Sequence, residues 1–367
     1  MFEGSKISSR QAVFLITTVI VPTSILFLPH MIYVAAKRDA WLSVLAITLF
    51  GLGVGDIIGR LGRRFPGQTV VQYSRRLLGP VLGGAVGLVY AGFFIYINAF
   101  VVREFSEMLV TNYYKETPQV VFVLGIVFVA VYIVWYGLEV LTRVNDMVLP
   151  LVLIMLGVLL ITSVPIAEPE NLLPVLDNGV GPVLQGAVPA AVFFDETVIM
   201  LVLISNLTRP AEARVAIAKA VLLVGLIQLL VVVTVVTVLG TLTENQLYPT
   251  LHLARHLRVG PYLANVDPLI LLIWILGGFL KVTIFHYCAT ICAAQLLGLS
   301  GYGLVSVVNG AILSILAVVL WEDAIELSYQ ISRIIPPFFL AVQAGIPVLL
   351  LAVAFFKRQG VTAGDRN

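Results

Sequence analysis

Ten long apolar runs follow one another along the chain, separated by short polar segments. They lie at 11–36, 40–59, 84–110, 119–138, 147–165, 182–205, 215–240, 268–297, 302–321 and 333–356. A helix needs about 20 mostly apolar residues to cross the roughly 30 Å of bilayer hydrocarbon, and each run is close to that length or longer. The pattern predicts an all-α integral membrane protein with ten transmembrane helices.

Composition agrees with this prediction. The 367 residues are 60% hydrophobic and 11% charged, with a mean hydropathy of +1.03, far outside the range of soluble globular domains. The first run follows Lys6 and Arg10, as a signal sequence would, but it is longer than a signal peptide's apolar region and lacks a small-residue cleavage site. We interpret it as a retained helix. Cys288 and Cys292, one helical turn apart, are expected to be buried without a disulfide.

The distribution of basic residues predicts the topology. Of the 22 lysines and arginines, fourteen fall in segments on the same side of the membrane as the N-terminus and six in segments on the opposite side. The other two, Arg103 and Lys281, lie within runs. The positive-inside rule therefore places both termini in the cytoplasm. Because five helices precede an external loop at 166–181 and five follow it, the first half (1–165) and the second half with its cytoplasmic tail (182–367) have opposite orientations, as in an inverted repeat.

The first run of each half contains a feature that disfavours a continuous helix. Pro22 lies halfway along the first run, where it removes a backbone donor. The adjacent acids Asp195 and Glu196 lie midway along the sixth run. Transporters place broken helices at this depth to bind small charged ligands, so we expect the first and sixth helices to be broken. The competing interpretation is that Pro22 only kinks an intact helix.

Charged side chains in the runs should face one another or water, since a charge at the bilayer centre costs at least roughly 2.5 to 3.5 kcal/mol. Lys281 lies at the same estimated depth as the acidic pair, and Glu196 is its expected partner. Two interpretations stay open: a buried ion pair that locks helices together, or a charge-coupling site for a ligand or proton. Arg103, Glu104 and Glu107 are expected to form salt bridges near the outer end of the third helix.

A ligand site is expected at the membrane midplane between the two broken helices. Free N–H groups of the second half of the first helix would bind a carboxylate, and free carbonyls of the sixth helix, with Asp195, would receive an ammonium. The predicted lining residues are Thr23, Ser24, Ile25, Tyr96, Phe193, Phe194 and Asp195. This polarity suits a small zwitterionic amino acid. The loop at 241–267, with a short helical pattern at 250–257, is long enough to form an external lid.

Several stretches, in order along the chain, resemble one known family. They are Lys6-Ile7-Ser8, Ile25-Leu26-Phe27-Leu28-Pro29, Asn171-Leu172-Leu173-Pro174-Val175, Gly181-Pro182-Val183-Leu184-Gln185-Gly186-Ala187, Glu196 and Tyr248-Pro249-Thr250-Leu251. The chain resembles the spore germination permeases, the B subunits of GerA-type germinant receptors, within the amino acid-polyamine-organocation superfamily. One departure is that related transporters generally have glycine in the first unwound segment, where this chain has Pro22-Thr23-Ser24.

The resemblance implies a LeuT-like five-plus-five fold, the inner membrane of a dormant spore, and assembly with A-type and C-type receptor subunits. It also implies that the chain senses a small amino acid or similar nutrient. A proton-coupled amino acid transporter is the alternative, and an ion or water conduit is a third. Without a GxxxxGK[ST] motif, nucleotide hydrolysis is not expected. We expect no enzymatic activity, cofactor, metal or nucleic-acid partner.

Overall fold

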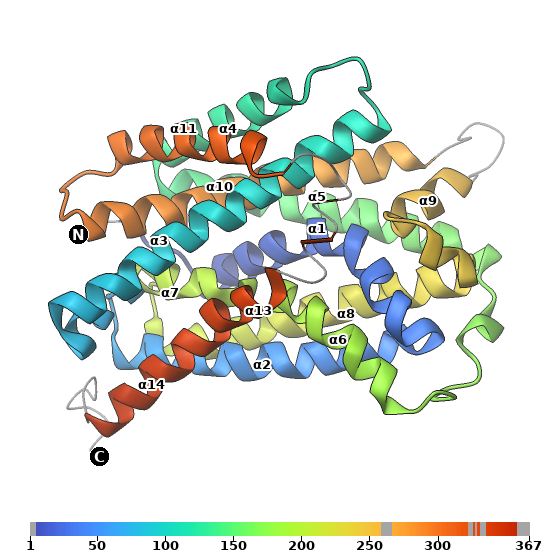
Figure 1. The fold of residues 1–367 in the computed structure, drawn as a ribbon, viewed down its shortest axis with the longest axis horizontal. Helices are drawn as coiled ribbons and strands as arrows, with labels where there is room; N and C mark the ends of the chain where they lie inside the picture. Colours follow the sequence, from blue (N-terminus) through green and yellow to red (C-terminus); the bar gives the residue numbers. More distant parts are fainter. Residues whose placement is uncertain (1–4, 258–265, 322–325, 327–328, 331–334, 358–367) are drawn as a thin grey trace.

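The computed structural model describes residues 5–257, 266–321, 326, 329–330 and 335–357, and almost all of them are helical (Figure 1). Part of the predicted lid loop at 241–267, the start of the last predicted run and the C-terminal tail lie outside the described residues. The α-helices are α1 Ser9–Ala36, α2 Ala40–Arg64, α3 Val70–Asn112, α4 Gln119–Tyr136, α5 Leu138–Ser163, α6 Val180–Phe194, α7 Met200–Leu203, α8 Ala213–Leu239, α9 Pro249–His256, α10 Asp267–Leu296, α11 Gly303–Val319, α13 Ile335–Leu340 and α14 Ile346–Phe356.

Each of the ten predicted apolar runs contains a helix. Within the described residues, eight segments are long and apolar enough to cross a membrane. The first of these, Ser9–Arg64, contains both α1 and α2, while α11 is shorter, at 17 residues. The helical membrane fold is therefore confirmed, and the number of ten crossings stays a prediction.

Local sequence signals set where the helices begin. Ser8 and Gln11 form a reciprocal capping box at the start of α1, in which each side chain accepts a hydrogen bond from the other residue's backbone N–H. Thr69 and Gln72 form the same arrangement before α3. Within α3, Gly79 adopts a φ of 86° ahead of Pro80, which separates a short first helix from the membrane-length part.

The first helix is bent but not broken. All residues of α1 from Ser9 to Ala36 are α-helical, although the helix changes direction along its length (Figure 1). The predicted unwinding at Pro22 is therefore wrong, and the competing interpretation of a kinked helix holds. The reason is packing: the Pro22 ring lies directly against Gly277 of α10, and the neighbouring Ser24 hydroxyl donates to the Ile20 carbonyl at 2.6 Å. These contacts favour a helical turn at the proline.

The sixth run is broken where the sequence predicts. Helix α6 ends at Phe194 and is followed by the 3-10 helix η4 Asp195–Ile199, the short α7, and a second 3-10 helix, η5 Ile204–Asn206. Both acids, Asp195 and Glu196, lie in the first turn of η4. The changed helical pitch turns these side chains to directions that a continuous α-helix would not give them.

Close packing joins α2 to the second half of the chain. A Cβ added at Gly55 or Gly59 would lie 2.6 or 2.7 Å from atoms of α8, and one added at Gly62 would lie 2.6 Å from Ile204. Small residues at this helical spacing allow two membrane helices to approach closely. The start of α1 lies at the same end of the bundle, because Ile7 pairs with Leu207.

Candidate functional site: a buried lysine at the helix break

A single buried ammonium group connects three segments at the break in the sixth run. Lys281 Nζ of α10 lies 2.7 and 2.9 Å from the two carboxylate oxygens of Glu196 in η4, and 2.6 Å from Thr23 Oγ1 of α1. An ammonium has three donors, and here each has an acceptor. The side chains of Lys281 and Glu196 are only 1% and 5% exposed. The predicted pairing of these two residues is confirmed.

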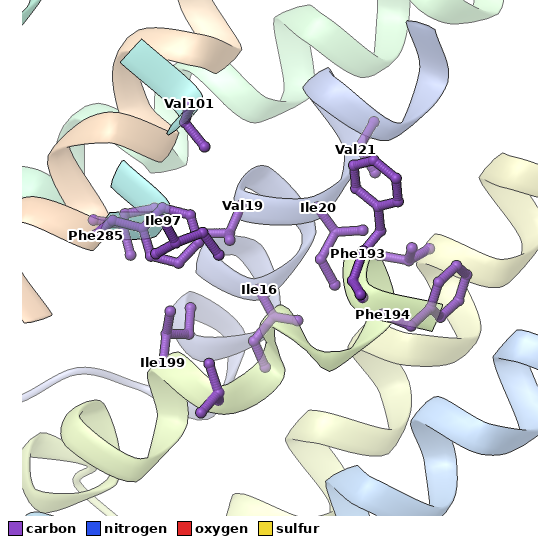
Figure 2. Close-up of a cluster of buried hydrophobic side chains, with 14 of the residues drawn as sticks. Ile16, Val19, Ile20, Val21, Ile97, Val101, Phe193, Phe194, Ile199 and Phe285 are labelled. Carbon is purple, nitrogen blue, oxygen red and sulfur yellow. The ribbon is translucent and has the colours of Figure 1, made fainter. Parts of the chain in front are cut away.

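Apolar side chains surround this ion pair. Lys281 Nζ lies 5.9 Å from the centre of the Phe193 ring and 5.7 Å from that of Phe285. Figure 2 shows the buried cluster formed at this level, with labelled residues Ile16, Val19, Ile20, Val21, Ile97, Val101, Phe193, Phe194, Ile199 and Phe285. Because the two charges are buried among apolar side chains, they attract each other strongly, but each one also becomes costly if its partner is lost.

Asp195 is buried without a partner. Its exposed fraction is 0%, and neither carboxylate oxygen has a hydrogen-bond partner among the described residues. Buried polar groups are nearly always hydrogen-bonded, so an unpartnered carboxyl group calls for a specific explanation. Its position, directly after the last residue of α6, is the one expected for the acceptor of a ligand ammonium.

Glu104 also belongs to this region, which the sequence analysis did not anticipate. It is 2% exposed, its Oε1 has no partner in the described part of the chain, and it lies within electrostatic range of Lys281 and Glu196. The neighbouring pair Arg103 and Glu107 forms the predicted salt bridge at 3.4 Å. Arg103 pairs with Glu107, and the sequence has no other lysine or arginine within one helical turn of Glu104. The sequence therefore already indicated that Glu104 needs a partner on another helix.

The remaining predicted site residues do not form one cluster. Ser24 accepts a hydrogen bond from Gln228 Nε2 of α8. Phe194 packs against α2, because a Cβ added at Gly51 would lie 3.1 Å from the Phe194 side chain. Tyr96 is only partly buried and faces another aromatic group, formed by Trp321, Phe338 and Phe339. Depth along a helix placed these residues near the midplane, but it did not fix which way each side chain points.

Helix α9 covers the second half of α1 and confirms the short helix predicted at 250–257 in the lid loop. Pro29 has no N–H to donate to the Ile25 carbonyl, and Thr250 Oγ1 of α9 donates to that carbonyl instead, at 2.5 Å. Next to it, the rings of Tyr248 and Phe27 lie 5.1 Å apart in an edge contact. Two stretches that carry the family resemblance therefore meet at this contact. Burial raises the pKa of the Tyr248 phenol, which keeps its proton.

Replacing Thr250 with valine is expected to loosen this cover. The valine fills similar space but leaves the buried Ile25 carbonyl without a donor, at a cost of about 1 to 3 kcal/mol. Hydrogen exchange should become faster across 249–256, while Thr250→Ser should stay close to the parent protein. Thr241→Val, at an exposed site in the same loop, is the control. Equal exchange in Thr250→Val and the parent protein would show that the hydroxyl does not hold α9.

An open cavity of about 640 Å³ lies between α1, α6 and α13. It is lined by His30, Met31, Val34, Ala35, Gln185, Val188, Pro189, Pro336 and Pro337. The lining residues of α6 precede Asp195 by about two to three helical turns. The cavity therefore lies along α1, which carries Thr23, and along α6, which ends directly before Asp195. Among the described residues, no group of three or more histidines, cysteines or acids could hold a metal ion. Cys288 and Cys292 are free and buried, as expected.

Solved structures with a similar arrangement of helices include transporters. The crystal structure of MhsT in complex with L-phenylalanine aligns with a TM-score of 0.65, at 11% identity, over 96% of this chain and 99% of that one. Mhp1, a nucleobase-cation-symport-1 family transporter, aligns with a TM-score of 0.60 over 99% of this chain and 82% of that one. Fold and buried centre together define a multi-pass helical membrane protein with a LeuT-like fold, as the sequence predicted.

Sequence comparison then identifies the family. Residues 6–323 match the family described as "Spore germination protein", and the chain belongs to it. Among its relatives are two proteins of Bacillus subtilis (strain 168). Spore germination protein YndE is 27% identical over 97% of this chain and 98% of its own length, and spore germination protein KB is 28% identical over 97% and 96%. The resemblance inferred from the sequence is confirmed.

Proposed function

We propose that this chain is the membrane subunit of a spore nutrient germinant receptor and that it binds a small amino acid-like germinant near the break after α6. The observation that carries the proposal is the buried, unpartnered carboxyl group of Asp195. A ligand ammonium would supply the missing donors. Family membership and the transporter fold support the same role.

The charge balance favours a ligand that carries an ammonium group. Lys281 is paired with Glu196, and two more buried carboxyl groups belong to this region: Glu104, within electrostatic range of Lys281, and Asp195, adjacent to Glu196 in the sequence. Since α1 is continuous, its N–H groups are not free to bind a ligand carboxylate. In our proposal that carboxylate instead approaches Lys281, which would exchange its contact with Thr23.

Binding measurements on the purified full-length protein test this site. L-alanine, glycine and L-valine are titrated, with propionate as the probe that lacks an ammonium group. Asp195→Asn should weaken binding of the amino acids by on the order of tenfold or more, a loss of about 1.4 kcal/mol. Asp177→Asn, at an exposed position of the external loop, should leave it unchanged. Equal affinity of Asp195→Asn and the parent protein, or equal binding of propionate, would remove Asp195 as the ammonium acceptor.

Proton-coupled amino acid transport is the second candidate, and the excess of buried carboxyl groups over lysine favours it. Taking up a proton would relieve this excess, so a change of protonation could accompany a change of conformation. Uptake of labelled amino acids into proteoliposomes, with and without a pH gradient, separates the two functions. Accumulation driven by the gradient indicates a transporter, and binding without accumulation indicates a sensor.

The family relationship supports two further parts of the proposal. We expect the chain to reside in the spore inner membrane with both termini in the cytoplasm, and to assemble with A-type and C-type receptor subunits. Large apolar side chains on α4 and α11, such as Phe128, Leu304 and Val319, are 71 to 75% exposed. Such faces suit contact with lipid or with other membrane subunits.

A further inference from the structure

A second pocket lies between the end of α2 and the end of α14, and none of its lining residues belongs to the buried lysine's site. Its volume is about 700 Å³. One side carries four arginines and the other is apolar. The lining residues are Ile57, Arg60, Arg63, Arg64, Arg214, Val348, Leu351, Ala352, Phe355 and Phe356. A pocket with both kinds of wall suits a ligand that has an anionic head and an apolar body.

In the part of the chain that the structure describes, acids do not balance the arginines of this pocket. Asp56 pairs with Arg60 at 2.7 Å and with Arg214. Neither Arg63 nor Arg64 has an ion pair within the described residues, and Nη1 of Arg64 is buried without a hydrogen-bond partner. Among the described residues, one carboxylate therefore faces four guanidinium groups, and two of these keep donors for a ligand. Guanidinium groups bind phosphate oxygens in a bidentate manner.

The apolar wall places the pocket at the edge of the membrane. Val348 and Leu351 lie within Ile335–Phe356, a segment long and apolar enough to span a bilayer. Phe355 and Phe356, at its end, are 69% and 83% exposed, and Arg64 lies 5.9 Å from the Phe355 ring centre. Aromatic and basic residues at the end of a membrane helix typically occupy the headgroup region. A free phosphate ion would use the arginines but leave the apolar wall without a partner.

We propose that this pocket binds the phosphate of an anionic phospholipid, whose acyl chain lies along α14. Basic pockets between membrane helices are a known site class for such headgroups. With a net charge of three from four arginines and Asp56, the pocket should favour the two phosphates of cardiolipin over the single phosphate of phosphatidylglycerol. The bound lipid would tie α2 to α14 at this end of the bundle.

Lipid titration followed by native mass spectrometry tests the site on the full-length, delipidated protein in detergent. Cardiolipin should bind with one-to-one stoichiometry, phosphatidylglycerol more weakly, and phosphatidylcholine and inorganic phosphate negligibly. The double variant Arg63→Gln/Arg64→Gln should bind cardiolipin on the order of tenfold more weakly, because it loses two charge-assisted contacts. Its melting temperature without lipid should change little, because neither arginine has an ion pair within the chain's described part and the Phe355 ring that Arg64 faces is largely exposed.

A matched variant removes the same charge elsewhere. Arg10→Gln/Arg143→Gln neutralises two arginines that are 70% and 72% exposed, on α1 and α5, and it should bind cardiolipin like the parent protein. Equal weakening in both double variants would reduce the effect to general charge attraction and overturn the proposal. So would unchanged cardiolipin binding by Arg63→Gln/Arg64→Gln, or binding of inorganic phosphate at the same concentration as lipid.

Discussion

Replacing Lys281 with methionine is expected to destabilise the protein by about 3 to 5 kcal/mol, because it leaves Glu196 buried without its cation. Glu196→Gln alone should be costly for the reciprocal reason. The double variant Lys281→Met/Glu196→Gln should lose less stability than the sum of the single changes, because no uncompensated charge of the pair is left. Thermal or denaturant unfolding of the four proteins in one detergent measures this difference.

An exposed pair provides the matched control for this cycle. Arg143 and Glu139 lie 2.5 Å apart, but their side chains are 72% and 55% exposed. Surface pairs contribute about 0 to 1 kcal/mol, so Arg143→Met and Glu139→Gln should have small, nearly additive effects. If the changes at Lys281 and Glu196 are also simply additive, the buried contact does not stabilise the fold through charge compensation.

The same cycle tests the role of Glu104. This acid lies within electrostatic range of the pair, so Lys281→Met/Glu196→Gln still leaves the Glu104 carboxyl group buried and without that cation. Adding Glu104→Gln to the double variant should therefore recover further stability. Adding Glu116→Gln, at an exposed position beyond the end of α3, should not.

The sequence predicted the helical fold and the Lys281–Glu196 contact for one physical reason. Water and lipid differ strongly as solvents, so the length of an apolar run indicates a membrane helix, and a charge within such a run indicates a buried partner. A lysine in the middle of an apolar run needs a partner, and Glu196 was an acid at the same depth. The break after Phe194 was predicted in the same way, from two adjacent acids where a continuous membrane helix would be unfavourable.

What the sequence could not show depends on how helices face one another. The fate of Pro22 was decided by its contact with Gly277, a residue more than 250 positions away, and no local pattern reports such a contact. Tyr96 was expected in the ligand site because of its depth, but the rotation of α3 turns it toward Trp321. Rotation about a helix axis follows from packing, and depth estimates leave it undetermined.

The contact between Pro22 and Gly277 leads to the second large effect. A Cβ added at Gly277 would lie 2.3 Å from Cγ and 2.5 Å from Cβ of Pro22. The proline ring has no rotamer that avoids the clash, so Gly277→Ala must push α1 away from α10. Since Gly277 is one helical turn from Lys281, this shift should also disturb the contact with Thr23. We expect a loss of about 1 to 3 kcal/mol, as for other overpacked sites.

Gly157→Ala on α5 is the matched control, because a Cβ there meets no atom within 4 Å. Alanine is favoured over glycine inside a helix by about 0.5 to 1 kcal/mol, so this variant should unfold at the same temperature as the parent protein or higher. Adding Pro22→Gly to Gly277→Ala removes both side-chain atoms that the new methyl group meets, Cβ and Cγ, and should restore part of the lost stability. Were Gly277→Ala to unfold like Gly157→Ala, the close approach of α1 and α10 at Pro22 would be refuted, and with it the reason that α1 stays helical there.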